Sequence, residues 1–342
     1  MGKEIAEILK IISTLSKKET KKLMEEMNKM LKGEKTSKAE LLMIEIKKKM
    51  ETERGILCPH CNSSNIIGHG NYRERKRYKC NECDKTFNDM TGTPMSWTHY
   101  PEKWKEYFKY MTEGRSLRYI AKELEIDLKT AFYWRHKILN AFQKIGCEKL
   151  EGIVEADETF FLSSEKGNKN LQNRKPRKRG GKAQKRGLSS EQIPVITSCD
   201  RNSHYIVGVA GGGRIHAPEV EKTLGKYVDE SNTLCSDGER SYKIFTENHN
   251  MNHEIVKSKR GQRIKNIIYH IQNINNYHSR LKEWMRGFHG VATKYLSHYM
   301  HWFRILEKVK KRYDQLGLFI KNAFIVTEII SNACVISAKP QF

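Results

Sequence analysis

The sequence predicts an α/β (α+β) protein in which a small zinc-binding unit and a helical unit precede a mixed β-sheet flanked by helices. Three observations predict this order. Two CxxC pairs lie near the start of the chain, residues 101–145 carry apolar side chains at helical spacing, and short apolar strands alternate with turns and helices from residue 151. A chain of 342 residues is long enough for two or three compact units.

The composition favours a nucleic-acid partner. The chain has 63 Lys and Arg against 40 Asp and Glu, a formal net charge of +23. Such a charge attracts polyanions. No apolar run approaches the roughly 20 residues that a membrane span needs, so we expect no membrane association.

Residues 1–50 are predicted to be helical, because Ile5, Ile8, Leu9 and Ile12 follow the spacing of one helix face. A helical hairpin or arm that packs on a neighbour explains this pattern without a specific role. The full set of expected boundaries is a helical region at 1–50, a zinc ribbon at 51–95, a helix-turn-helix at 101–145, the α/β domain at 151–310 and a C-terminal helical segment at 311–342.

The four cysteines of the ribbon are Cys58, Cys61, Cys80 and Cys83, with eighteen residues between the two pairs. Two tight turns with paired thiolates close a tetrahedral zinc site that has no open position for chemistry. Disulfides are the alternative, but the N-terminus lacks the apolar core of an export signal. We therefore expect structural Zn²⁺ in a reduced, intracellular protein.

The helical unit has the rhythm of a helix-turn-helix. Ser116 is a candidate cap for its second helix and Asp127 for its third. The third helix would enter the major groove of DNA, although a plain three-helix bundle has a similar pattern. The side chains predicted to contact DNA from it are Lys129, Thr130, Tyr133 and Arg135.

A basic insertion at 165–190 interrupts the α/β domain. It is too polar, and interrupted by too many glycine and proline residues, to pack into a core. Two interpretations are a disordered charged loop and a flexible segment that clamps a phosphate backbone. Its candidate DNA contacts are Arg177, Lys178 and Arg179.

Two carboxylates are placed where strands are expected to end. Asp157 follows the apolar Ile153, Val154 and Ala156, and Asp237 follows Leu234 and Cys235. Two acids that share a cleft repel each other unless a cation neutralises them, so the pair suggests a Mg²⁺ or Mn²⁺ site. By spacing alone, a structural or solvated pair of aspartates explains the same pattern.

The motifs EADETFF, LCSDGERSY, HIQNINNYHSRLK and GFHGVATKYL, in this order after a ribbon and a helix-turn-helix, resemble the transposases of the IS1595 family with their ISXO2-like transposase domain. The resemblance covers about residues 55–310. It implies a ribonuclease H-like fold with an acidic metal site, terminal inverted repeats and target DNA as partners, and a dimer or larger assembly on DNA. It also implies a cytoplasmic, nucleoid-associated protein of a prokaryotic cell.

The resemblance also assigns site residues. Asp157 and Asp237 match the first two metal ligands, Asn275 stands where many members have Glu, and Lys282 matches the basic position seven residues later. Seven residues are nearly two helical turns, so Asn275 and Lys282 share a face. An amide oxygen is a neutral ligand, so the second ion should bind more weakly than with Glu. Glu283 is the alternative acid, and Asn275 as a helix cap is the alternative role.

Together these features predict a DNA transposase that cleaves and joins strands with two metal ions. A regulator that only binds DNA, built from the same ribbon and helices, is one alternative, and a metal-dependent nuclease without strand transfer is another. Glu158 is expected on the opposite strand face from Asp157.

Overall fold

The computed structural model describes residues 56–72, 75–171, 175–176, 180–256, 264–310, 312–325 and 335. The predicted helical region 1–50 lies outside these residues, and so do Arg177, Lys178 and Arg179 and the segment 326–334. No helix in the described part of the chain is both long and apolar enough to cross a membrane.

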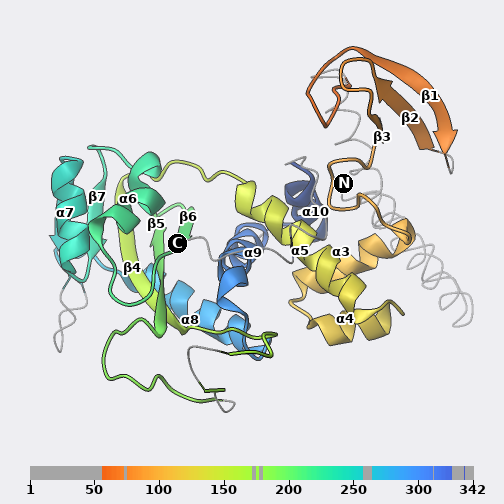
Figure 1. Ribbon diagram of the computed structural model, residues 1–342. Helices are drawn as coiled ribbons and strands as arrows, with labels where there is room; N and C mark the ends of the chain where they lie inside the picture. The colour runs from red at the N-terminus through yellow and green to blue at the C-terminus, as the bar shows by residue number, and fades with distance from the viewer. Residues whose placement is uncertain are drawn as a thin grey trace, which may run out of the picture.

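The first described unit is a three-stranded antiparallel sheet in the order β1-β2-β3. Figure 1 shows it at one end of the molecule, away from the larger sheet. Its small core contains Cys58, Cys80 and Phe87. The strands are β1 (Ile66–Tyr72), β2 (Arg75–Cys80) and β3 (Thr86–Asn88).

Three helices follow, and both predicted caps are present. Ser116 Oγ accepts a hydrogen bond from the backbone N–H of Tyr119, and Asp127 Oδ1 accepts one from Lys129 N–H at 2.7 Å. Gly114 ends the first helix with φ +68°, and a Cβ there would lie 2.9 Å from the indole nitrogen of Trp284. The helices are α3 (Trp104–Thr112), α4 (Leu117–Glu123) and α5 (Leu128–Lys144), with a short 3₁₀ turn, η1 (Pro101–Lys103), before α3.

The second half of α5 is surrounded by protein on all sides. Arg135 is only 1% exposed; its guanidinium donates to Arg115 O at 2.7 Å and lies 5.0 Å from the ring centroid of Trp302. A buried side chain cannot meet a DNA phosphate or base. The prediction that Arg135 contacts DNA is therefore wrong, because tertiary packing covers a helix face that its sequence left polar.

The larger sheet has five strands in the order β6-β5-β4-β7-β8. Strand β5 runs antiparallel to both of its neighbours, β6 and β4. Strands β4, β7 and β8 run parallel to one another. The predicted mixed sheet flanked by helices is confirmed. Its strands are β4 (Ile153–Leu162), β5 (Gln192–Cys199), β6 (Tyr205–Val209), β7 (Thr233–Ser236) and β8 (Asn252–Ile255).

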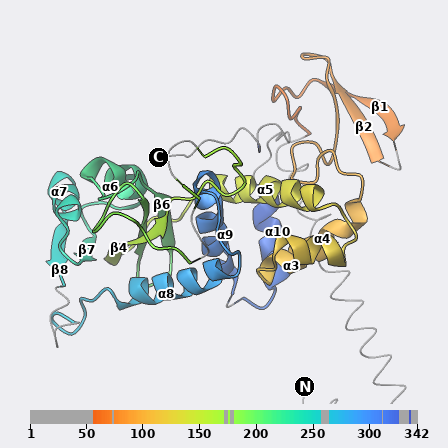
Figure 2. The same ribbon diagram turned by 60° about the horizontal axis from the view of Figure 1, so that its bottom comes forward.

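Helices cover both faces of this sheet. On one face α6 and α7 enclose a core with Val154, Ile196 and Tyr242. On the other face α8 lies along β4, as Figure 2 shows, and α9 packs on β6. The helices are α6 (Ala217–Leu224), followed by a 3₁₀ turn η2 (Gly225–Tyr227), then α7 (Arg240–Asn248), α8 (Gln272–Arg286), η3 (Thr293–Tyr295), α9 (Leu296–Val309) and α10 (Gln315–Ile325).

The α8 face of the sheet shares one hydrophobic core with α3, α4 and α5. Trp134 on α5, Tyr277 on α8 and Phe319 on α10 belong to the same cluster. The predicted units 101–145 and 151–310 are therefore packed together rather than joined by an open linker.

Glu155 joins the sheet to the start of α8. Its side chain is 1% exposed and forms an ion pair with Arg201, while its Oε1 accepts from the Asn273 amide at 2.8 Å. Its Oε2 accepts from the backbone N–H of Ile274 at 3.1 Å. Since Ile271 provides no side-chain cap, Glu155 satisfies a free N–H at the positive end of the helix from another element.

We predict that Glu155→Ala lowers the free energy of unfolding by about 3 kcal/mol, because it leaves Arg201 without its carboxylate and α8 without its cap. Urea unfolding followed by tryptophan fluorescence measures the change. Glu247→Ala is the control: Glu247 is 62% exposed and lies 3.8 Å from Lys243, and such surface pairs contribute less than about 1 kcal/mol. Equal losses in the two variants would contradict the anchoring role.

Two buried histidines join α5 to α9. His136 is 1% and His298 is 9% exposed, and their Nδ1 atoms are 3.2 Å apart. Burial lowers the pKa of His298 to about 4, and burial together with the neighbouring His298 holds the pKa of His136 well below its usual value. Both rings are therefore neutral in the folded protein at neutral pH.

We predict acid sensitivity from this pair. Between about pH 6.5 and pH 4 the unfolded chain binds protons that the folded chain does not, so the free energy of unfolding falls with falling pH. The expected slope is about 1.4 kcal/mol per pH unit for each histidine. His298→Gln should flatten the dependence measured by urea unfolding across this range, and a slope identical to that of the native protein would refute the assignment.

Candidate active site

The structure brings Asp157 and Asp237 together. Strands β4 and β7 are parallel, with Glu155 opposite Cys235. Two residues further along each chain, Asp157 comes level with Asp237, which directly follows the last residue of β7. Neighbouring strands lie about 4.8 Å apart. Asp157 and Asp237 therefore lie side by side, where β7 ends next to β4.

Both acids face α8. Side chains two residues apart on a strand share a face, and Glu155 already contacts the start of α8. Burial and the neighbouring Asp237 raise the pKa of Asp157 to about 6, with Lys282 acting in the opposite direction. Asp157 thus carries its negative charge at an energetic cost, which a bound cation would remove.

The residues predicted on the matching helix lie along one face of α8. Asn275, His278 and Lys282 are spaced by three and four positions, so they form a stripe over two turns. His278 Nδ1 is 3.7 Å from Asp157 Oδ2, which shows that this stripe is turned toward the acid pair. Asn275 and Lys282 are exposed on either side of the buried His278.

His278 has a defined protonation state. Burial and the charge of Lys282 lower its pKa to about 4, so the ring is neutral. Its Nε2 is hydrogen-bonded to Thr197 Oγ1, and that hydroxyl donates to the backbone oxygen of Asp157 at 3.1 Å. Because the hydroxyl has one hydrogen, Nε2 is the donor in this chain. The unprotonated Nδ1 consequently faces Asp157.

Glu158 lies on the other face of β4, as the strand alternation predicts. Tyr242 on α7 donates a hydrogen bond to Glu158 Oε2 at 3.2 Å. Burial, and then Asp157 and Asp237, raise the pKa of Glu158 to about 7. Glu158 therefore adds to the negative potential around the acid pair from behind the strand, without sharing the face of α8.

The four ribbon cysteines converge. Their sulfur atoms all lie within 4.8 Å of one another. Cys58 Sγ is 3.6 Å from Cys83 Sγ, and Cys61 Sγ is 3.5 Å from Cys80 Sγ. A tetrahedral zinc ion with bonds of about 2.3 Å needs sulfur atoms about 3.8 Å apart. The donor set and its geometry fit a structural zinc ion.

The predicted DNA-facing residues divide into three groups. Lys129, Thr130 and Tyr133 lie in the first turns of α5 and are exposed or half-buried, with the Lys129 ammonium 6.0 Å from the Tyr133 ring centroid. Arg135 is buried, as described above. The three basic residues of the insertion are outside the described part of the chain.

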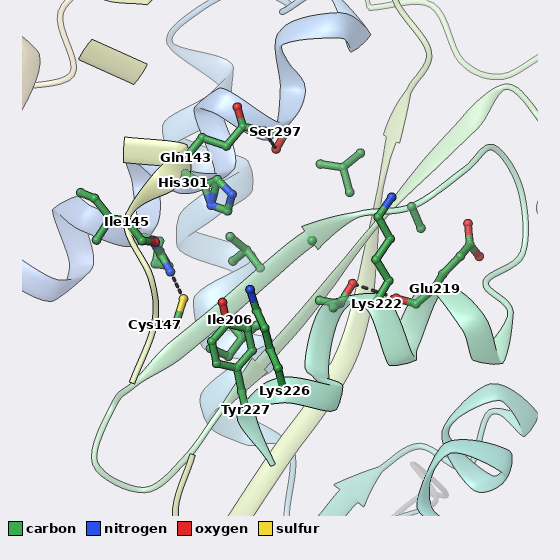
Figure 3. A pocket seen from close by; sticks show the side chains of 16 residues that line it. Gln143, Ile145, Cys147, Ile206, Glu219, Lys222, Lys226, Tyr227, Ser297 and His301 are labelled. Carbon is green, nitrogen blue, oxygen red and sulfur yellow. Dashed lines mark hydrogen bonds between the residues drawn. The ribbon is translucent and has the colours of Figure 1, made fainter. Parts of the chain in front are cut away.

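Two cavities lie near the larger sheet, one beside α8 and one beside β6. One of about 720 Å³ lies between the end of β4, the basic insertion and α8, and Lys282, Arg286 and His289 line it. Figure 3 shows the other, of about 220 Å³ beside β6, with Lys222 and Lys226 on one side and His301 on the other. Asp157 and Asp237 line neither cavity. The first cavity borders α8 at Lys282 and Arg286.

Glu155 was missed by reasoning from the sequence, and His278 was ranked low. Glu155 carries one readable signal: it lies two residues before Asp157 and must share its strand face. His278 likewise falls between Asn275 and Lys282 on the helix stripe. A contact between Glu155 and the start of α8, 119 residues away, has no local signal.

Parts of the chain are similar to known proteins. Residues 149–304 match the family described as the ISXO2-like transposase domain. A protein of the transposable element ISH50 of Halobacterium salinarum, itself described as uncharacterized, is 28% identical over 264 residues, which cover 75% of this chain and 87% of the relative. A chain of a pre-cleavage Mos1 transpososome is 10% identical with a TM-score of 0.22, covering 66% of this chain and 80% of that one.

Residues 149–304, which carry the acid pair and α8, are therefore similar to the ISXO2-like transposase domain.

Proposed function

We propose that this protein is the DNA transposase of an insertion sequence, which binds the terminal inverted repeats of its element and catalyses strand cleavage and strand transfer. The observation that carries the proposal is the position of Asp157 on β4, level with Asp237 just after β7 and next to His278 of α8, in a region that matches a transposase domain. Burial and the neighbouring Asp237 raise the pKa of the half-buried Asp157, so its charged form is costly unless a cation neutralises it.

The residues present fit Mg²⁺ or Mn²⁺. Carboxylate oxygens of Asp157 and Asp237 and the amide oxygen of Asn275 are the hard ligands that these ions prefer. When bound, the ions would activate a water or a 3′ hydroxyl and stabilise the leaving oxygen. The sulfur-rich ribbon site, in contrast, suits zinc.

The surrounding side chains have separate roles in this proposal. The neutral His278, held by Thr197, keeps the Asp157 side of the site rigid and free of a competing positive charge. Lys282, on the same stripe, would bind a phosphate oxygen of the strand that approaches the acids. Glu155 fixes the start of α8 and so sets the position of Asn275 relative to both acids.

In this proposal, DNA is recognised by α5 and by the basic insertion. Lys129, Thr130 and Tyr133 on α5 would contact the terminal repeat, and Arg177, Lys178 and Arg179 of the insertion would contact phosphates. Joining an element to a target requires both of its ends in one complex, so we also propose a dimer or larger assembly on DNA.

The acid pair separates this proposal from its alternatives. A regulator that only binds DNA gains nothing from two acids held together at a sheet edge. A metal-dependent nuclease would use the same acids, and only the products distinguish it: joined strands support transposition, and cut ends alone support the nuclease.

We predict that Asp157→Ala and Asp237→Ala each abolish Mg²⁺-dependent cleavage and joining of terminal-repeat DNA, because each removes a charged ligand. Binding of the same DNA should remain. Gel assays of cleavage and joining, with a binding assay beside them, measure both effects. Joining that persists in Asp157→Ala would rule out the mechanism.

Asn275→Ala should weaken binding of Mn²⁺ by about tenfold, since it removes one of three protein ligands, and Asn276→Ala is its matched control. Both asparagines are exposed on α8, but neighbouring residues point about 100° apart on a helix. Calorimetric titration with Mn²⁺ tests the pair. Equal effects of the two variants would reassign the third ligand to Glu283 or water.

The ribbon should hold one zinc ion per chain, and we predict that Cys80→Ser removes it. The loss should unfold the ribbon and weaken binding of terminal-repeat DNA, while the affinity of the acid pair for Mn²⁺ stays unchanged. Atomic absorption and Mn²⁺ titration measure the two sites separately, with Ser64→Ala as the control within the ribbon. A parallel loss of Mn²⁺ binding would show that the two sites are coupled.

A further inference from the structure

Trp97 is displayed on the surface in an unfavourable backbone conformation. Its side chain is 82% exposed, and its φ of +64° lies in the left-handed region, which bulky residues rarely adopt. All five tryptophans of the chain lie in the described part, and the others are buried or half-buried: Trp104, Trp134, Trp284 and Trp302. A strained and exposed aromatic side chain is a marker of a binding role.

The residues on both sides of Trp97 are held in place. Ser96 is 3% exposed, its hydroxyl donates to Met90 O at 2.5 Å, and its own backbone oxygen accepts from Lys137 Nζ at 2.7 Å. On the other side, Thr98 Oγ1 accepts from the indole N–H of Trp104 at 3.0 Å. The backbone is therefore fixed while the indole ring projects away from the protein.

The contact between Ser96 and Lys137 joins the segment that carries Trp97 to α5. Lys137 lies four residues after Tyr133 and seven after Thr130, so the three share one helix face. At 1.5 Å per residue, Thr130 and Lys137 are about 10 Å apart along the axis. Lys137 is 5% exposed, so Trp97 follows a residue that is fixed where this face of α5 becomes covered by protein.

The neighbouring surface combines aromatic rings with cations. Tyr100 is 46% exposed, and the ammonium of Lys103 lies 5.1 Å from its ring centroid. Lys129 and Tyr133 form a similar pair at 6.0 Å. Rings that can stack on bases, next to cations that can neutralise phosphates, are typical of nucleic-acid surfaces.

We propose that Trp97 is a DNA-contacting wedge, whose indole ring stacks against a base step of the terminal-repeat duplex next to the site read by α5. This inference rests on the proposed function, since it assumes that the amino-terminal half binds duplex DNA. An apolar wedge unstacks a base step and bends the duplex, which lets more protein surface reach it. The same ring adds affinity without adding charge.

The first test uses the full-length protein and a duplex of the terminal repeat that flanks the gene. In the free protein, acrylamide should quench the fluorescence of Trp97 efficiently, and the duplex should shield it. Trp97→Phe identifies the signal by removing it. An indole already shielded in the free protein would show that residues 1–55 or a second copy cover it, and would overturn the proposal.

The second test compares affinities over a range of salt concentrations. Trp97→Ala should weaken binding of the duplex by about tenfold, as expected for one lost stacking contact, and Trp97→Phe should restore most of it. The slope of log affinity against log salt should not change, because no phosphate contact is lost. Lys129→Ala should instead reduce that slope by about one.

The controls separate the possible failures. Tyr313→Ala removes a ring that is 98% exposed, outside the proposed surface, and should leave DNA affinity unchanged. If Trp97→Ala binds the duplex as tightly as the native protein, the wedge is refuted while the transposase proposal stands. If the native protein binds the terminal-repeat duplex no better than a random duplex of equal length, the proposed function fails first. Preference of Trp97 for single-stranded over duplex probes would also overturn the wedge.

Discussion

The buried carboxylate of Glu155 is the interaction on which the candidate active site depends. It lies at 1% exposure between Arg201 and the start of α8, and it replaces the side-chain cap that Ile271 does not provide. A buried charge of this kind is stable only while all its partners are in place. The register of α8 against β4, and with it the approach of His278 to Asp157, follows from this one anchor.

The shared core extends that constraint to the rest of the molecule. Because α5 packs against α9 and α10 along its second half, the helix that presents Lys129 and Tyr133 is rigidly connected to the sheet that carries the acids. The same packing explains why Arg135 is buried over Trp302. The proposed transposase would gain from such a connection, since misplacement of a reacting group by about 1 Å is costly to catalysis.

Much of the architecture could be predicted from local patterns. The caps Ser116 and Asp127 lie where short polar side chains precede apolar periodicity, and the strand over Ile153–Leu162 follows from its apolar, β-branched start. Arg135 could not be predicted correctly, because a polar face on one helix says nothing of the helices that will cover it. The exposure of Trp97 was equally hidden, since a tryptophan in a sequence is normally assigned to a core.

By itself, the sequence determined the chemistry available to this protein: four thiolates at zinc spacing, two acids at strand ends, a helix with Asn275 and Lys282 on one face, and a strongly basic surface. These are local properties, set by residue type and by the periods of helix and strand. Tertiary structure alone decided which groups meet. It put Glu155 at the start of α8, turned His278 toward Asp157, buried Arg135 and exposed Trp97, because burial and contact depend on elements that are distant in the chain.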